Sequence, residues 1–218
     1  MVKCYLSLEG HKNGVQHATF SPNGKLIATV SWDKTAKIWD VETGEEIYTL
    51  TGHENMVEHV VFSPDNQYLI TVSLDNTARV WDVENGKESL ILRGHTNGLS
   101  YATFSSDNKY IVTTSWDNTV RLWDAITGEN LWVREHQAGI NHAAFSPNDE
   151  MIVTGSNDNT VRLWEIKTGR PIKTLQGHES KAILLSCYLY HQQFLWSVVD
   201  ILHLQKIWNL NLNLIMLV

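Results

Sequence analysis

Short runs rich in β-branched and aromatic residues follow one another along the chain, and turn residues separate them. In the first part of the chain these runs are residues 15–20 (VQHATF), 26–31 (LIATVS), 35–41 (TAKIWDV) and 46–50 (EIYTL). The segments between them, SPNGK, WDK and ETGE, are typical of tight turns. Helical periodicity never persists long enough to compete with this pattern. The pattern therefore predicts four short strands joined by hairpins.

The same pattern returns at a nearly constant interval. The histidines that mark it stand at steps of 42, 42, 41 and 42 residues: His11, His53, His95, His136 and His178. In the first four units a phenylalanine follows nine residues after the histidine, an aspartate 22 after it and a tryptophan 28 after it. We expect a positive φ at the glycine that closes each third hairpin: Gly44, Gly86, Gly128 and Gly169. A period in this range predicts a repeat architecture.

The interval divides residues 1–218 into a single repeat domain. We expect a lone outer strand at 1–10 and regular units at 11–52, 53–94, 95–135 and 136–177. The last unit, 178–218, is degenerate: its final forty residues contain no glycine and no proline. Asp200 keeps the expected spacing from His178, but Trp208 comes two residues late and Val198 replaces the serine. We interpret this unit as a decayed or truncated repeat, or as the product of a reading-frame fault.

Composition narrows the class of protein and its location. The chain has 218 residues, 43% hydrophobic and 19% charged, as in an ordinary soluble domain, and its formal net charge of −7 argues against nucleic acid as the partner. Two cysteines are too few for a disulfide framework. Residues 182–199 are uncharged, but His191, Gln192 and Gln193 argue against a membrane span. We expect an intracellular, cytoplasmic protein, with the nucleus as the alternative.

Several motifs recur in phase with the period. "GH" stands at 10–11, 52–53, 94–95 and 177–178, and "WD" stands at 39–40, 81–82 and 123–124. Glu135 and Glu165 are mild departures from the two motifs. With these motifs at this period, the chain resembles the WD-repeat β-propeller family. The resemblance implies an all-β fold of four-stranded antiparallel blades around a central channel. About five blades are expected, as an unusual ring or as an incomplete, fragmentary arc.

The resemblance also implies that each blade contains a hydrogen-bonded tetrad of Trp, Ser or Thr, Asp and His. By position the expected tetrads are Trp39, Ser31, Asp33 and His11; Trp81, Ser73, Asp75 and His53; Trp123, Ser115, Asp117 and His95; and Trp164, Ser156, Asp158 and His136. A buried indole, hydroxyl or imidazole costs free energy unless it is partnered, which explains why the motif recurs. A catalytic triad of Ser, His and Asp is disfavoured, because four such sets occur on regular strands without a strained nucleophile turn.

A second histidine follows six residues after the first in three units, at His17, His59 and His142, while Tyr101 takes this place in the third. These histidines could suggest metal ligation, but ligands from separate blades would then have to converge on one ion. We favour packing near the channel, and we predict neither a metal ion nor any other cofactor.

In this family, partners usually dock on the end of the propeller that carries the turn between the second and third strands. The resemblance places eight residues of this chain there: Gln16, Trp32, Glu58, Leu74, Ser100, Trp116, Asn141 and Asn157. They suit a protein or peptide with a basic or aromatic anchor, through apolar contact, cation–π attraction and charge. The alternative is that they merely cover the loops.

Two functions follow from the resemblance. The first is a non-catalytic scaffold that presents a docking face to a protein or peptide, without nucleic acid or membrane as partner. The second is a sensor or regulatory propeller, cut from a larger signalling protein whose ATPase-type or kinase-type catalytic domain is absent from this sequence. An arc of blades would also leave open sheet edges, through which we expect self-association.

Overall fold

The computed structural model describes residues 7–176, and every regular element in that range is a β-strand. The strands are β1 (Val15–Phe20), β2 (Leu26–Ser31), β3 (Ala36–Asp40) and β4 (Glu46–Leu50); β5 (Val57–Phe62), β6 (Tyr68–Ser73), β7 (Thr77–Asp82) and β8 (Glu88–Arg93); β9 (Leu99–Phe104), β10 (Tyr110–Ser115), β11 (Thr119–Asp124) and β12 (Asn130–Glu135); β13 (Ile140–Phe145), β14 (Met151–Ser156), β15 (Val161–Glu165) and β16 (Pro171–Leu175). The predicted all-β fold is confirmed.

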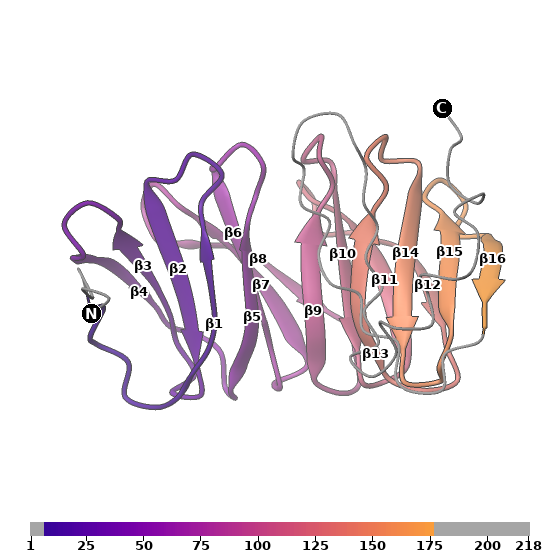
Figure 1. The fold of residues 1–218 in the computed structure, drawn as a ribbon, viewed down its shortest axis with the longest axis horizontal. Coiled ribbons are helices and arrows are strands. Elements are labelled where there is room, and N and C mark those ends of the chain that lie inside the picture. Colours follow the sequence, from indigo (N-terminus) through magenta and orange to yellow (C-terminus); the bar gives the residue numbers. More distant parts are fainter. Residues whose placement is uncertain (1–6, 177–218) are drawn as a thin grey trace, which may run out of the picture.

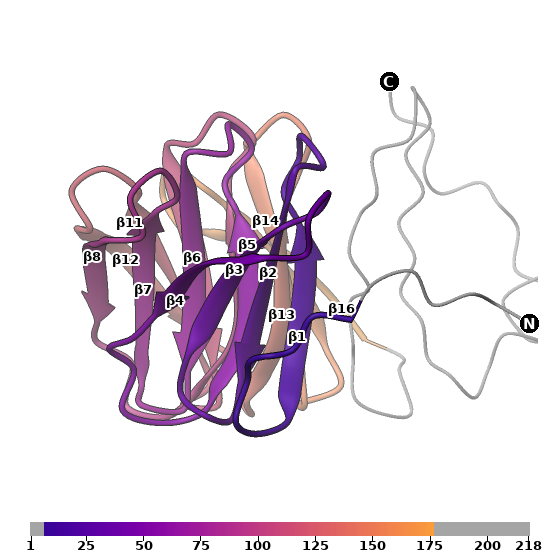
Figure 2. The ribbon, with the colours of Figure 1, turned by 90° about the vertical axis from the view of Figure 1, so that its left-hand side faces the viewer.

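Each successive group of four strands forms one antiparallel sheet, called here blades 1 to 4. The strand order follows the chain, as in β1-β2-β3-β4 for blade 1. Figure 2 looks onto blade 1 and shows these four strands side by side. The predicted fifth blade (178–218) and most of the predicted outer strand (1–10) lie outside the described residues, and residues 7–10 form no strand.

The blades stand next to one another in chain order, from blade 1 (indigo) to blade 4 (orange) in Figure 1. Their first strands, β1, β5, β9 and β13, contact one another in sequence and form the inner side of the arc. Blades 1 and 4 stand at opposite ends of this row in Figure 1, so the described sheets do not close into a ring. The described part is therefore an open arc of four blades.

The apolar core lies between blades. At the junction of blades 1 and 2, Val30, Ile38 and Leu50 pack in one cluster with Val57 and Leu69. The two later junctions repeat this arrangement with equivalent residues. Burying each such side chain contributes about 1.5–3 kcal/mol relative to exposure. The apolar burial thus lies mostly between neighbouring repeats.

The third hairpin of each blade turns through a glycine with positive φ. The φ angles are 73°, 67°, 71° and 65° at Gly44, Gly86, Gly128 and Gly169, which confirms the prediction. At Gly86 an added Cβ would also lie 2.8 Å from the ring of Tyr48 in the neighbouring blade. Glycine is therefore required there by the backbone and by the packing.

Candidate functional site

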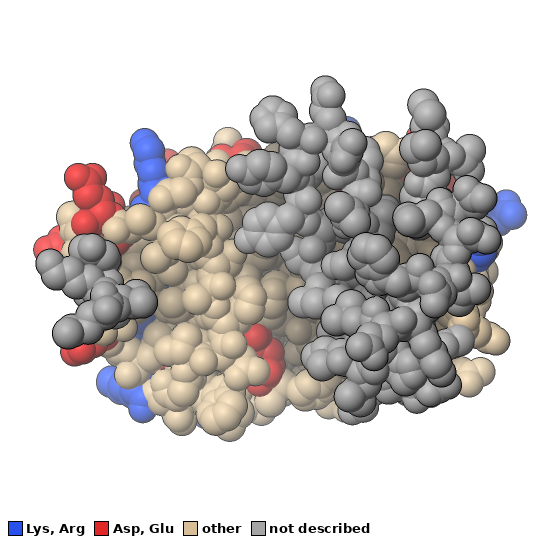
Figure 3. Space-filling view, in the orientation of Figure 1, with Lys and Arg blue, Asp and Glu red and all other residues tan. Residues whose placement is uncertain are grey.

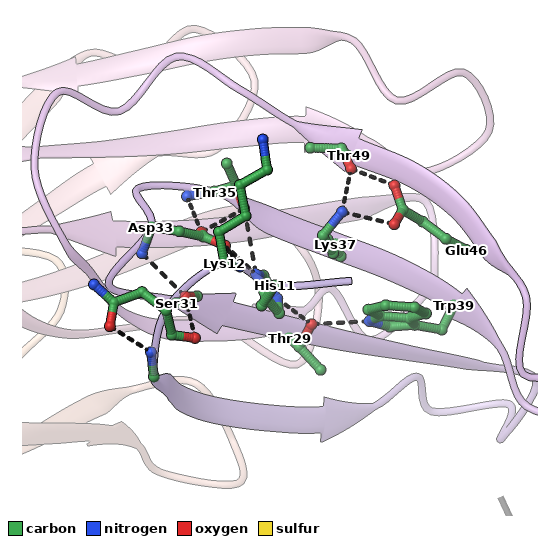
Figure 4. Close-up of polar contacts among 12 residues, drawn as sticks. His11, Lys12, Thr29, Ser31, Asp33, Thr35, Lys37, Trp39, Glu46 and Thr49 are labelled. Carbon is green, nitrogen blue, oxygen red and sulfur yellow. Dashed lines mark hydrogen bonds and ion pairs between the residues drawn. The ribbon is translucent and has the colours of Figure 1, made fainter. Parts of the chain in front are cut away.

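A chain of hydrogen bonds joins the "GH" histidine to the tryptophan of the third strand in every described blade. In blade 1, shown in Figure 4, His11 Nδ1 lies 2.9 Å from Asp33 Oδ2, and His11 Nε2 lies 2.7 Å from Thr29 Oγ1. Trp39 Nε1 donates to the same Thr29 oxygen at 2.8 Å. Blades 2 to 4 repeat these bonds at 2.7–3.0 Å.

The hydroxyl of this network belongs to a threonine, so the assignment of Ser31, Ser73, Ser115 and Ser156 to the tetrads is wrong. The groups that occupy this position are Thr29, Thr71, Thr113 and Thr154. Thr29 pairs with Lys37 across the strands, which places it diagonally opposite Trp39 on the same face of the sheet. Ser31 lies two residues further along the strand, roughly 6.6 Å away, so it is too far from the indole.

The serines hold the turn instead. Ser31 Oγ accepts a hydrogen bond from the Asp33 backbone N–H at 3.0 Å and donates to the Asn13 carbonyl at 3.2 Å. Asp33 also accepts hydrogen bonds from the Lys12 N–H at 2.8 Å and from the Thr35 hydroxyl at 2.6 Å. The aspartate therefore joins the histidine network to the turn that follows the second strand.

The ionised state of the aspartate determines which groups of the network donate hydrogen bonds and which accept them. Burial acts to raise the pKa of Asp75, but hydrogen bonds from His53 and Thr77 outweigh it and hold the pKa well below its ordinary value. The pKa values of Asp33, Asp117 and Asp158 are lowered in the same way. Because an ionised carboxylate only accepts, the histidine Nδ1–H donates to it, Nε2 accepts from threonine, and threonine accepts from tryptophan.

This network fixes the turn that carries half of the predicted docking residues. Trp32, Leu74, Trp116 and Asn157 each directly follow a second strand and precede the tetrad aspartate. The Trp32 N–H donates to the Gly14 carbonyl at 3.0 Å, and the same bond occurs in the other three blades. These four residues therefore stand in equivalent places along one end of the arc.

The other half of the predicted set lies on β-bulges in the first strands. In blade 1, Val15 pairs with Ser31 and His17 with Val30, which leaves Gln16 as the extra residue. Glu58, Ser100 and Asn141 are the extra residues of the equivalent bulges. A bulge redirects the side chain of the unpaired residue. We call the eight residues on these turns and bulges the rim.

The rim carries two exposed indoles on close-packed supports. The exposed fractions of Trp32 and Trp116 are 43% and 42%. A Cβ added to Gly14 would lie 3.3 Å from the Trp32 ring, and one added to Gly139 would lie 3.3 Å from Trp116 Cδ1. Leu74 approaches Gly98 of the next blade in the same way. Glycine thus lets each of these large side chains approach the backbone closely.

The polar members of the rim hydrogen-bond to one another and across blades. Gln16 Nε2 donates to Glu58 Oε2 at 3.2 Å, and Asn141 Nδ2 donates to Asn157 Oδ1 at 2.8 Å. Ser100 Oγ donates to the Ile140 carbonyl of the next blade at 2.5 Å. Burial raises the pKa of Glu58, and the hydrogen bond from Gln16 opposes this shift.

One apolar residue of this end was not in the predicted set. Met56 occupies the position of Gly14, Gly98 and Gly139 and has 37% of its surface exposed. Its carbonyl accepts the N–H of Leu74 at 3.0 Å, so it belongs to the same turn contact. The break in the glycine pattern at this one position was the available signal.

The second histidines form a row of rings along the inner strands. Ring centroids are separated by 4.2 Å between His17 and His59, 4.2 Å between His59 and Tyr101, and 3.8 Å between Tyr101 and His142. Within residues 7–176 no group of three or more His, Cys, Asp or Glu side chains is arranged to hold a metal ion. Figure 3 shows that the visible part of this inner face is mostly uncharged.

Membrane contact has one structural test here. None of the described residues forms a helix, so none forms a helix long and apolar enough to cross a membrane. The uncharged segment at 182–199 lies outside the described residues.

Four-stranded blades, inner strands along an arc and a Trp–Thr–His–Asp network define a WD-type β-propeller protein. The sequence model of the family described as "WD domain, G-beta repeat" matches residues 2–40, 44–82, 86–124 and 128–165. These matches cover well over half of the chain, which therefore belongs to the WD40 repeat family.

Individual relatives match over about one repeat. The chain is 48% identical over 40 residues to "Ribosome assembly protein 4" of Chaetomium thermophilum, covering 18% of this chain and 8% of that protein. It is 48% identical over 46 residues to "Ribosome biogenesis protein WDR12 homolog" of Brugia malayi, covering 21% and 11%. It is 55% identical over 42 residues to "Probable E3 ubiquitin ligase complex SCF subunit sconB" of Talaromyces marneffei, covering 19% and 6%. The matched segments thus span a small part of each relative.

Proposed function

We propose that the chain is a non-catalytic scaffold that docks a protein or peptide on the rim. The observation that carries this proposal is the pair of half-exposed indoles, Trp32 and Trp116, at equivalent places in blades 1 and 3. Large aromatic side chains on a rigid support are the residues that most often dominate protein interfaces. WD40 repeats themselves indicate a protein–protein interaction scaffold.

The chemistry of the rim favours a partner with a basic or aromatic anchor. Tryptophan faces attract cations, and Glu58 places a carboxylate on a neighbouring bulge. The names of the relatives denote assembly factors and a subunit of a ligase complex, which supports an assembly role of the same general kind. Each match is too short to transfer a particular complex. We also propose an intracellular location, in the cytoplasm or the nucleus.

Affinity capture with quantitative mass spectrometry tests the proposal. The 218-residue chain is compared with the Trp32→Ala/Trp116→Ala variant and with an Ile126→Ala control, since Ile126 is 80% exposed in the turn between β11 and β12. We expect the rim variant to lose captured proteins by at least about tenfold, the equivalent of about 1.4 kcal/mol, while the control retains them. Equal capture by all three proteins would contradict the proposal that partners dock on the rim.

A further inference from the structure

Each described blade carries a basic side chain on its third strand, two residues before the tetrad tryptophan. These residues are Lys37, Arg79, Arg121 and Arg162. Strand residues two positions apart share a face of the sheet, so each cation lies on the face of its tryptophan. Each is therefore placed to meet the residue that pairs with that tryptophan on the fourth strand.

In blades 1 and 2 this fourth-strand residue is a glutamate that neutralises the cation. Glu46 pairs with Trp39 in the sheet and lies 2.6 Å from Lys37 Nζ. Glu88 pairs with Trp81 and accepts a hydrogen bond from the Arg79 guanidinium. The two blades thus define a seat in which a carboxylate meets the basic side chain.

Blade 3 keeps the cation but has no carboxylate in the seat. Asn130 pairs with Trp123, and its amide donates to the Leu122 carbonyl at 3.4 Å. With the residues that the structure describes, the Arg121 guanidinium forms neither a hydrogen bond nor an ion pair. The Nε atoms of Arg79, Arg121 and Arg162 are all buried without a partner, so Arg121 differs from the other two at its terminal Nη groups.

Blade 4 also lacks the glutamate, but its arginine contacts other oxygen atoms. Arg162 donates to the Glu135 carbonyl at 2.9 Å and lies 3.6 Å from Asp158. Arg121 is therefore the one cation of this register, among the four in the described range, without an oxygen partner.

The Arg121 guanidinium is held in place without such a partner. It lies 5.9 Å from the centroid of the Trp123 ring, and a Cβ added to Gly94 would come within 2.8 Å of its Nη1. Arg79 has the same relation to Gly52, where the equivalent distance is 2.7 Å. Arg121 therefore stands in the same surroundings as Arg79, with only the carboxylate missing.

We propose that Arg121 is a docking site for an acidic side chain of a protein partner, whose carboxylate takes the place that Glu88 has in blade 2. A half-buried, unpaired cation is unfavourable, and a guanidinium fixed on one side offers its free N–H groups to a planar carboxylate. The site lies on β11 and β12 and contains no rim residue. Its test is therefore independent of the test of the proposed rim function.

Arginine side-chain NMR of the full chain tests this site with a defined probe. The probe is the acetylated and amidated tripeptide Ser-Glu-Ser, and the isosteric control is Ser-Gln-Ser. We expect a saturable shift of the Arg121 Nε–Hε signal with the acidic peptide and none with the control. No saturable shift of this signal would overturn the proposal.

Two variants make the test specific. Asn130→Glu supplies the carboxylate from within the chain, so it should weaken peptide binding at Arg121 at least about tenfold while retaining or raising the unfolding midpoint. Glu88→Asn empties the seat in blade 2, so Arg79 should then respond to the peptide as Arg121 does. Unchanged binding to a folded Asn130→Glu protein would show that the peptide does not occupy this seat.

Discussion

Blade 2 buries the apolar side chains of its first strand, whereas blade 1 exposes the equivalent ones. Val57 and Phe62 are 0% and 4% exposed, but Val15 and Phe20, each 42 residues earlier, are 55% and 63% exposed. The strands have the same length, register and bulge; among the described residues, β5 packs against a preceding blade and β1 does not. The apolar pattern of a repeat therefore specifies an interface with its neighbour rather than a core of its own.

The other end of the arc shows the same effect on the opposite face. Leu50 and Leu92, at the ends of β4 and β8, are 2% and 1% exposed. The equivalent Leu175 at the end of β16 is 40% exposed. Both ends of the described arc therefore expose apolar side chains whose equivalents are buried at the junctions between blades.

At two of the three junctions a polar side chain also accepts a hydrogen bond from the preceding blade, and blade 1 lacks this side chain. At the junction of blades 1 and 2 the Asn23 N–H donates to Asn66 Oδ1 at 2.9 Å, and at the junction of blades 3 and 4 the Ser106 N–H donates to Asp149 Oδ1 at 3.1 Å. Blade 1 has Gly24 at the position of the two acceptors. Its free face therefore offers apolar contact without this polar link.

The largest effect is expected from a matched pair of core and end substitutions. Phe62→Ala should reduce the free energy of unfolding by about 3–5 kcal/mol, because it removes a side chain buried between blades. Phe20→Ala should cost less than about 0.5 kcal/mol, because its ring is exposed. Urea unfolding measures both. A comparable loss for Phe20→Ala would mean that the free face of blade 1 is covered in solution.

The tetrads should not show this difference, because their hydrogen bonds are complete in blade 1. Asp33→Ala and Asp117→Ala should each cost about 3 kcal/mol, since each removes the carboxylate that accepts the Nδ1–H of a buried histidine. Asp107→Ala, in an exposed turn, should cost roughly 0.5 kcal/mol. Chemical denaturation of the three variants checks this order. If Asp33→Ala proved as mild as Asp107→Ala, the network of the end blade would not be formed in solution.

Acid should weaken the inner strands before it affects the aspartates. Burial lowers the pKa of His142 to about 4 and the pKa of His59 well below its ordinary value of 6.5. The unfolded chain then binds protons that the folded chain excludes, so stability is lost as pH falls below about 6.5. Each histidine contributes up to about 1.4 kcal/mol per pH unit.

Unfolding midpoints between pH 7 and pH 5 measure this loss, which we expect to reach about 2 kcal/mol for each histidine that excludes its proton. His59→Gln should flatten the dependence, because it removes one of the excluded protons. The aspartates, whose pKa values are depressed, should add a second loss only below about pH 4. A midpoint that is constant down to pH 5 would contradict the buried row of rings.

The smallest effect concerns association through the end faces. We expect the 218-residue chain to self-associate, and Phe20→Glu to weaken that association by about tenfold, because it places a charge on the free apolar face. Sedimentation velocity at several concentrations gives the result, and Ile126→Glu serves as the exposed control outside this face. A sharp monomer peak at 24.9 kDa for the unmodified chain would contradict the expectation.

The periodic features of the fold could be predicted because each is local. Strands, hairpins and the glycines with positive φ follow from short stretches such as "WDVENGKE". The residue that supplies the tetrad hydroxyl could not be predicted, because Thr29 and Ser31 are neighbours on the same face of the strand. Only the pairing of Thr29 with Lys37 decides between them.

Contacts between blades were harder to predict than contacts within them. The bulges at Gln16 and its equivalents follow from a register shift that leaves no compositional mark. The stacking of His17, His59, Tyr101 and His142 needs the spacing between inner strands, which no single repeat contains. That Asn130 leaves Arg121 without an oxygen partner follows from the pairing of the third and fourth strands rather than from residue types alone.

The repeats of the family model do not coincide with the blades: each repeat is offset from a blade by one strand. This offset has a consequence for how such chains change in length. The match at 44–82 begins at the last strand of blade 1 and ends at the third strand of blade 2. Removing about 42 residues from this point would join β3 to β8, which would complete the sheet of blade 1 as β4 does now. Duplication of a segment of this length, wherever the break falls, would likewise add a complete sheet. Arrays of this kind can therefore evolve by whole-blade steps without the breakpoints being selected for position.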